Sequence, residues 1–123
     1  IAQQNKNFTA SESGFYYNYE VKVENDTLKT PKFGDVLNYT YNVKNLQGNV
    51  IYSKDDINTK TYVMDKEELF TGLREGLKLM KSGETVTFIF PSQMAYGYYG
   101  DDNKIDANTP LICEVIVRDI FKN

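Results

Sequence analysis

The catalytic groups that this sequence contains, and those that it lacks, narrow the chemistry open to the protein. The chain has 123 residues, with no histidine and a single cysteine, Cys113. Without histidine, Ser-His-Asp and Cys-His catalysis and every His-ligated metal site are excluded. Cys113 lies in an apolar stretch, which is typical of an inert buried thiol. The remaining candidates are aromatic: 10 tyrosines and 7 phenylalanines, which suit strands and amphipathic pockets.

The acidic run DDNKID at residues 101–106 is the stretch most similar to a metal-binding loop. It fails the EF-hand pattern, because Ile105 stands where the pattern requires Asp or Asn and Asp106 where it requires Gly. We therefore interpret the run as a solvated loop and predict no metal site.

Composition and charge limit the class of protein and its partners. A chain of this length forms one domain, and its 41% hydrophobic and 25% charged residues are ordinary for a soluble globular protein. The net charge of −3 argues against a nucleic-acid partner. No apolar run approaches the length of a membrane span. The chain begins with Ile1 rather than Met, so we expect a processed form, with any signal peptide or lipid anchor upstream.

Residues 65–83 predict an amphipathic helix. Asp65 is placed to cap the first turn, with Glu68 three residues later to complete a capping box. Ser82-Gly83 predicts the end of the helix, because glycine adopts the left-handed cap at little cost. The one strong helix among several strands must bury its apolar stripe on the sheet. That stripe consists of Leu69, Phe70, Leu73, Leu77 and Met80.

Alternating apolar and polar residues predict strands on both sides of that helix. The predicted strands are residues 14–24, 36–43, 50–52, 61–64, 85–90 and 111–121, with a hairpin turn at residues 45–49. In the last strand, the expected core face consists of Leu111, Cys113, Val115 and Val117. The loop of residues 92–110 is long for a compact domain and is therefore a functional candidate. Residues 1–13 are polar and aperiodic, so we expect a flexible lead-in before a domain of residues 14–123.

The order of these elements, together with several separated motifs, resembles the FKBP family, the macrolide-binding peptidyl-prolyl cis-trans isomerases. The motifs are Asn38-Tyr39-Thr40, GLREGLKLM at residues 72–80 with Gly83 after it, Pro91-Ser92, Ala95-Tyr96-Gly97, and the closing strand of residues 111–120. Matches at several points with the expected spacing are far more specific than any single motif. The Tyr- and Asn-rich composition and the polar lead-in also resemble the FKBP-type lipoproteins associated with gliding motility in Bacteroidetes.

The resemblance implies an α+β fold, in which a curled antiparallel sheet of about five or six strands wraps around one amphipathic helix. It also implies an apolar substrate pocket between the start of the helix, the sheet and the long loop. Three residues take catalytic roles: Tyr39 as an aromatic wall, the Phe70 backbone N–H as a donor to the substrate carbonyl, and the Tyr96 hydroxyl as a second donor. Further pocket positions are Ile51, Tyr52, Leu69, Leu73, Ile105 and Cys113.

Several of these positions depart from the family pattern. Ile51 stands where the family usually has a Phe wall, and Tyr52 where it usually has Asp. Lys60 and Cys113 each take a position commonly held by Phe. Leu73 replaces the Trp floor of the best-known members. The implied pocket is therefore less aromatic, and we expect weaker macrolide binding than in members with the aromatic floor.

A pocket of this kind would accelerate rotation about an Xaa–Pro bond without a nucleophile, a metal, a cofactor or an acid–base pair. Rotation must break amide resonance, with a barrier of about 18–20 kcal/mol. The twisted amide carbonyl is less strongly solvated by water than the planar one. A dry apolar pocket with a few fixed donors therefore favours the twisted form over the planar ground state. This requirement agrees with a chain that contains no histidine.

Three hypotheses of function follow. The first is a prolyl isomerase of the periplasm or cell envelope, which binds Pro-containing polypeptides and assists the folding of secreted or envelope proteins. The second is a binding or chaperone module with little or no turnover, favoured by Tyr52, Lys60 and Cys113. The third is a structural subunit with the acidic loop and the preceding Tyr98-Tyr99 as its interface. Without the resemblance, Tyr39 reads as ordinary sheet packing.

Overall fold

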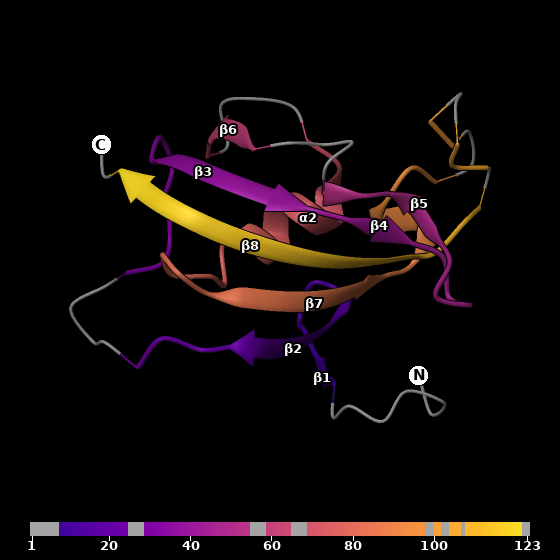
Figure 1. Cartoon of the computed structure of the whole chain (residues 1–123), viewed down its shortest axis with the longest axis horizontal. Helices are drawn as coiled ribbons and strands as arrows, with labels where there is room; N and C mark the ends of the chain where they lie inside the picture. The colour runs from indigo at the N-terminus through magenta and orange to yellow at the C-terminus, as the bar shows by residue number, and fades with distance from the viewer. Residues whose placement is uncertain are drawn as a thin grey trace.

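The structure is a computed structural model that describes residues 8–24, 29–54, 59–64, 69–97, 100–101, 104–106 and 108–121. An antiparallel sheet curls around the helix α2 (Thr71–Leu77), and a short 3-10 helix, η1 (Ser92–Met94), follows the strand β7 (Thr85–Phe90) (Figure 1). The strands are β1 (Thr9–Ala10), β2 (Tyr16–Val21), β3 (Val36–Tyr41), β4 (Val43–Lys44), β5 (Val50–Tyr52), β6 (Lys60–Val63), β7 (Thr85–Phe90) and β8 (Leu111–Phe121). No helix in the described part of the chain is long and apolar enough to cross a membrane.

The sheet is built around β8, which lies between β7 and β3 (Figure 1). The strand order is β1-β2-β7-β8-β3-β6, and β4 pairs with both β8 and β5. All of these pairs are antiparallel. The predicted α+β fold is therefore confirmed. The sheet has 8 strands, more than expected. The predicted strand of residues 36–43 is interrupted at Asn42, which divides it into β3 and β4, and β1 is added at the edge of the sheet.

The edge strand β1 lies inside the segment that the sequence predicts as a flexible lead-in. Thr9 and Ala10 pair with Tyr17 and Tyr16 of β2. Sheet structure thus begins before residue 14. The sequence did not predict this strand, because a short polar strand has no apolar periodicity. Residues 1–7 lie outside the described residues, and the domain boundary at residue 14 stays a prediction.

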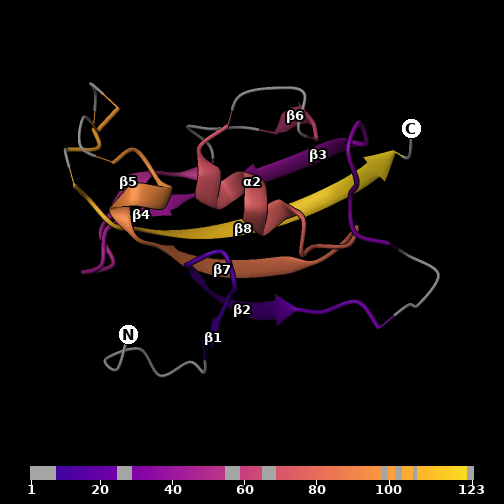
Figure 2. The ribbon, with the colours of Figure 1, turned by 180° about the vertical axis from the view of Figure 1, so that it is seen from behind.

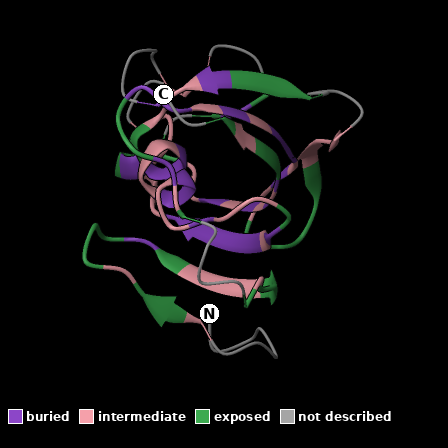
Figure 3. Ribbon diagram, turned by 90° about the vertical axis from the view of Figure 1, so that its left-hand side faces the viewer, coloured by how far each residue is buried: buried purple, intermediate pink, exposed green. Residues whose placement is uncertain are grey.

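The core lies between the concave face of the sheet and α2. The predicted inner face of β8 is confirmed, since Leu111, Cys113, Val115 and Val117 are all 0% exposed. Figure 3 shows that buried residues gather on α2 and on the strands that curl around it, whereas the edge near β1 is exposed. The strand β7 is buried from Val86 to Phe90, and it lies inside the sheet between β2 and β8.

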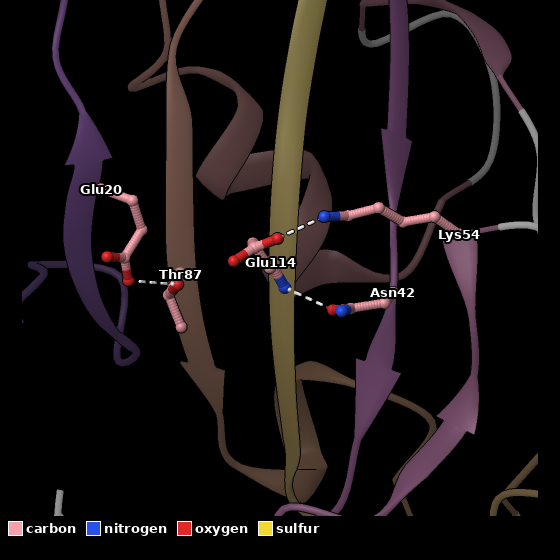
Figure 4. Close-up of polar contacts among 5 residues, drawn as sticks. All are labelled: Glu20, Asn42, Lys54, Thr87 and Glu114. Carbon is pink, nitrogen blue, oxygen red and sulfur yellow. Dashed lines mark hydrogen bonds and ion pairs between the residues drawn. The ribbon is translucent and has the colours of Figure 1, made fainter.

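The opposite face of the sheet is polar. Thr87 of β7 donates its hydroxyl to Glu20 of β2 at 2.7 Å, and Glu114 of β8 forms an ion pair with Lys54 (Figure 4). The Glu114 N–H donates to the side chain of Asn42, the residue between β3 and β4, at 2.9 Å. On the side away from α2, these contacts join β2 to β7 and join β8 to Asn42 and Lys54, whereas the concave face carries the apolar core.

The helix is shorter than the sequence predicts. It begins at Thr71, with Phe70 in the N-cap position and in an extended conformation (φ −61°, ψ 145°), and it ends at Leu77. Asp65 is therefore not the N-cap, and it lies with Glu68 outside the described residues. After Leu77 the chain makes tight turns, in which Met80 N–H donates to the Leu77 carbonyl at 3.2 Å. The apolar stripe misled the prediction because residues just outside a helix are buried at similar spacing, as the 0% exposure of Met80 shows.

The helix α2 lies in front of the sheet in Figure 2, and two of its glycines allow a close approach between helix and sheet. A Cβ atom added at Gly72 would lie 2.5 Å from the Phe90 ring and 2.8 Å from the Met94 carbonyl oxygen. At Gly76 it would lie 2.9 Å from the Phe88 ring. All three distances are shorter than a Cβ atom tolerates without displacement of its neighbours. The two glycines, four residues apart on one helix face, therefore fix the height of α2 above β7.

We expect Gly72→Ala to lower the free energy of unfolding by about 2 kcal/mol, because the added methyl group overpacks the Phe90 and Met94 contacts. This cost should exceed the gain of about 1 kcal/mol that alanine brings to a helix. Urea unfolding followed by circular dichroism measures the difference. Thr71→Ala in the same helix is the control, since Thr71 is exposed and should change stability by less than about 0.5 kcal/mol. A Gly72→Ala protein as stable as the unmodified chain would contradict the close approach.

Candidate active site

Phe70 joins the start of α2 to the loop that carries Tyr96. Its carbonyl accepts the first hydrogen bond of the helix, from the Arg74 N–H at 3.1 Å. Its ring lies edge-on to Phe90 at 5.6 Å and packs against the Tyr96 ring at 5.1 Å. The Phe70 N–H makes no hydrogen bond to another described residue. The Phe70 backbone donor is therefore uncommitted among the described residues.

Tyr96 is held in place by the backbone of its own loop. The carbonyl of Ser92 accepts from the Ala95 N–H at 3.0 Å and the Gly97 N–H at 2.8 Å, one on each side of Tyr96. Burial, and then the nearby Asp101, raise the pKa of the Tyr96 hydroxyl, so it remains a protonated donor at neutral pH. In the described part of the chain this hydroxyl has no hydrogen-bond partner. The loop is thus fixed by backbone bonds and not by the phenol.

Two tyrosines with stacked rings lie on β3, where Tyr39 is the predicted aromatic wall. Tyr39 is 3% exposed, and its ring stacks on that of Tyr41 at 5.8 Å with an interplanar angle of 15°. The two residues are two positions apart on one strand, so their side chains leave the same face. Across the sheet, Tyr39 lies opposite Val117 and Tyr41 opposite Val115. Tyr39 therefore has a packing role in the sheet, and its role as a pocket wall stays a prediction.

Asp101 ties the long loop to strand β5. The Tyr52 hydroxyl donates to one oxygen of the Asp101 carboxylate at 2.6 Å, and the Ile105 N–H donates to the other at 2.8 Å. The Asp101 N–H in turn donates to the Ile105 carbonyl at 3.0 Å. The sequence interpretation of the acidic run as solvated is wrong for Asp101, because this carboxylate accepts these bonds in a half-buried position. Asp102 and Asn103 lie outside the described residues, as do Tyr98 and Tyr99.

The other predicted pocket residues differ in how far they reach the surface. Leu73 and Cys113 are 0% exposed, and Ile105 is 3% exposed. Ile51, Tyr52 and Leu69 are half-buried and pack against the core. Leu73 and Cys113 are therefore enclosed core residues in this structure, and a contact of either with substrate stays a prediction. Burial also raises the pKa of the Cys113 thiol, which agrees with an inert role.

Sequence reasoning missed Tyr41 as a residue of this cluster. The pKa of Tyr41 is raised chiefly by burial, and next by Tyr96, Tyr39, Cys113 and Tyr52, so its neighbours are the predicted site residues. The alternation of strand residues 36–43 places Tyr41 on the face of Tyr39 and was the signal available. The partner of Tyr52, Asp101, had no such signal, because the contact joins residues 49 apart in sequence.

Two hollows lined by described residues lie away from this cluster. One, of about 140 Å³, is on the polar face of the sheet and includes Lys44, Ile112 and Glu114. The other, of about 450 Å³, lies between the β1–β2 turn and α2 and includes Tyr17 and Lys78. Neither contains a predicted site residue. Within the described residues, no group of three or more Cys, Asp or Glu side chains could hold a metal ion.

Comparison with known proteins identifies the class to which this fold and cluster belong. Residues 27–118 match the family model described as FKBP-type peptidyl-prolyl cis-trans isomerase. Because the match covers most of the chain, the protein belongs to the FKBP-type peptidyl-prolyl cis-trans isomerase family.

Individual relatives agree with this assignment. A protein of Haemophilus influenzae named "Probable FKBP-type peptidyl-prolyl cis-trans isomerase" is 28% identical over 94% of this chain and 46% of its own length. Human "Peptidyl-prolyl cis-trans isomerase FKBP9" is 33% identical over 68% of this chain and 15% of its own length. The crystal structure of FkpA from Escherichia coli superimposes with a TM-score of 0.80 at 24% identity, over 98% of this chain and 54% of that one. The chain thus spans about half or less of the length of these three proteins.

We expect Tyr52→Phe to loosen the long loop, because Asp101 loses the hydrogen bond that connects it to β5. Hydrogen bonds to charged groups contribute about 1.5–3 kcal/mol, so the free energy of unfolding should fall by about 1–2 kcal/mol. Amide hydrogen exchange should become faster at Ile105, whose N–H bonds to the same carboxylate. Tyr17→Phe, the same chemical change on β2, is the control. Unchanged exchange at Ile105 would show that the Tyr52–Asp101 bond does not order the loop.

Proposed function

We propose that this chain is a peptidyl-prolyl cis-trans isomerase that binds Pro-containing polypeptide segments at the cluster of Tyr39, Phe70 and Tyr96. The single observation that carries the proposal is the contact between the Phe70 and Tyr96 rings at 5.1 Å, which brings together the two residues that carry the proposed donors. Neither the Phe70 N–H nor the Tyr96 hydroxyl bonds to another described residue. Family membership supports the same reaction.

The proposed mechanism uses binding energy and no proton transfer. Uncatalysed rotation about an Xaa–Pro bond takes tens of seconds at 25 °C. Apolar walls from Tyr39, Ile51 and Leu69 would exclude water from the bound amide. The Phe70 N–H and the Tyr96 hydroxyl would then bond carbonyl oxygens of the segment in the twisted state, where the lost resonance makes rotation possible. The raised pKa of Tyr96 keeps this donor protonated, so we propose activity that is independent of pH between about 6 and 9.

The proposed clients are secreted or envelope proteins, and the proposed location is the periplasm or cell envelope. Both proposals rest on family membership and on the resemblance of the polar, Tyr-rich chain to envelope lipoproteins. The narrower resemblance to gliding-motility lipoproteins gains no support from the relatives above and stays a prediction. Recovery of the full-length protein in the cytoplasmic fraction of its cells would contradict the proposed location.

The alternative proposal is a binding or chaperone module with little turnover. Its support comes from Tyr52, whose hydroxyl is engaged by Asp101, and from Cys113, which is fully enclosed. A site closed in this way would still present Tyr96 and Phe70 to a bound segment. Saturable isomerase activity would exclude this alternative in its strict form.

We expect Tyr96→Phe to lower kcat/KM for isomerisation of an Ala-Leu-Pro-Phe tetrapeptide about five- to ten-fold, because one hydrogen bond of about 1–1.5 kcal/mol to the twisted amide is lost. The midpoint of urea unfolding should not change, since the hydroxyl makes no hydrogen bond within the described residues.

Tyr17→Phe is the matched control, because Tyr17 lies on β2 against Phe15 and Tyr19 and away from the cluster. This control should keep the full rate. Equal kcat/KM for the Tyr96→Phe protein and the unmodified chain would remove the role proposed for the Tyr96 hydroxyl.

A further inference from the structure

Tyr41 combines a buried ring with a reachable hydroxyl. The residue as a whole is 9% exposed, and its ring stacks on Tyr39 at 5.8 Å. Its hydroxyl makes no hydrogen bond to another described residue. Among those residues, every side-chain nitrogen or oxygen that is fully enclosed has a hydrogen-bond partner. The Tyr41 hydroxyl, which has none, is therefore not enclosed and must reach accessible space.

The surroundings of Tyr41 show which space its hydroxyl faces. The groups that act electrostatically on it are Tyr96, Tyr39, Cys113 and Tyr52, all members of the cluster described above. These groups come from the loop after η1, from β3, from β8 and from β5, so Tyr41 lies where the four segments converge. Burial and these neighbours raise its pKa, and the phenol stays a protonated donor at neutral pH.

The tyrosine hydroxyls of this cluster differ in whether they already have a hydrogen-bond partner. The Tyr52 hydroxyl is already used, because it donates to Asp101 at 2.6 Å. Those of Tyr41 and Tyr96 have no partner in the described part of the chain. A phenol that is desolvated on its ring and unpaired at its hydroxyl gains most from a ligand that brings a hydrogen-bond acceptor. In a polypeptide segment the acceptors on offer are backbone carbonyl oxygens.

We propose that Tyr41 is a substrate-binding residue, whose ring extends the Tyr39 wall and whose hydroxyl donates a hydrogen bond to a backbone carbonyl of the bound segment. This proposal rests on the proposed function, because it assigns the ligand to the same site. With Tyr96 it gives the site two side-chain donors in addition to the Phe70 N–H. The site then favours an extended segment that continues on both sides of proline over an isolated Xaa-Pro dipeptide, since a longer segment presents several carbonyls.

The test compares Tyr41→Phe with the unmodified chain and with Tyr17→Phe, using the Ala-Leu-Pro-Phe tetrapeptide. Because the bond forms in the bound ground state as well as in the transition state, the loss should appear mainly in KM. We expect KM to rise about five-fold with kcat within two-fold, and an unchanged midpoint of urea unfolding. The Tyr17→Phe protein should match the unmodified chain in both constants. A Tyr41→Phe protein with unchanged KM would overturn the proposal.

A binding measurement tests the role of Tyr41 separately from the proposed isomerase activity. If the unmodified chain does not accelerate isomerisation, the proposed function fails, and the dissociation constant of the same tetrapeptide then decides the role of Tyr41. Binding that weakens about five-fold in Tyr41→Phe would support that role without turnover. Equal affinities in the two proteins, or no binding to the unmodified chain, would overturn it.

Discussion

The close packing of α2 against β7 is the constraint on which the rest of the structure depends. Gly72 and Gly76 bring the helix backbone within reach of the Phe90 and Phe88 rings, where a Cβ atom would lie 2.5 and 2.9 Å from them. This height determines where the chain enters the helix, at Phe70. The Phe70 ring in turn contacts both Phe90 and Tyr96, so the position of the helix affects the position of the loop that carries Tyr96.

The candidate site combines this rigid side with a side that is held by polar contacts. On the rigid side, the stacked rings on β3 and the Phe70 ring belong to packed elements of the core. On the other side, Asp101 holds the long loop through the Tyr52 hydroxyl and the Ile105 N–H. Prolyl isomerisation needs such a fixed apolar surface with a few uncommitted donors, because the reaction changes only the twist and solvation of one amide.

The parts of the fold that follow from local pattern were predictable, and the parts that follow from distant contacts were not. Alternation gave the last strand and its buried face, including Cys113, correctly. Helical spacing overestimated the length of α2, because Met80 is buried and Phe70 half-buried just outside the helix at the same spacing. The family resemblance predicted Phe70 and Tyr96 as site residues, and their rings are in contact in the structure. Their catalytic roles stay predictions. The contact of Asp101 with Tyr52 depends on loop closure, which a local pattern does not encode.

The most direct test of this account is the rate of cis-trans isomerisation of a short Leu-Pro peptide with this chain present. The rate is measured with and without a macrolide, at a concentration shown to saturate binding to the same protein. The account predicts acceleration that is saturable in peptide and abolished by the macrolide, which places turnover at the Tyr39–Tyr96 cluster. No acceleration from the folded protein, across peptides with several different residues before proline, would contradict it.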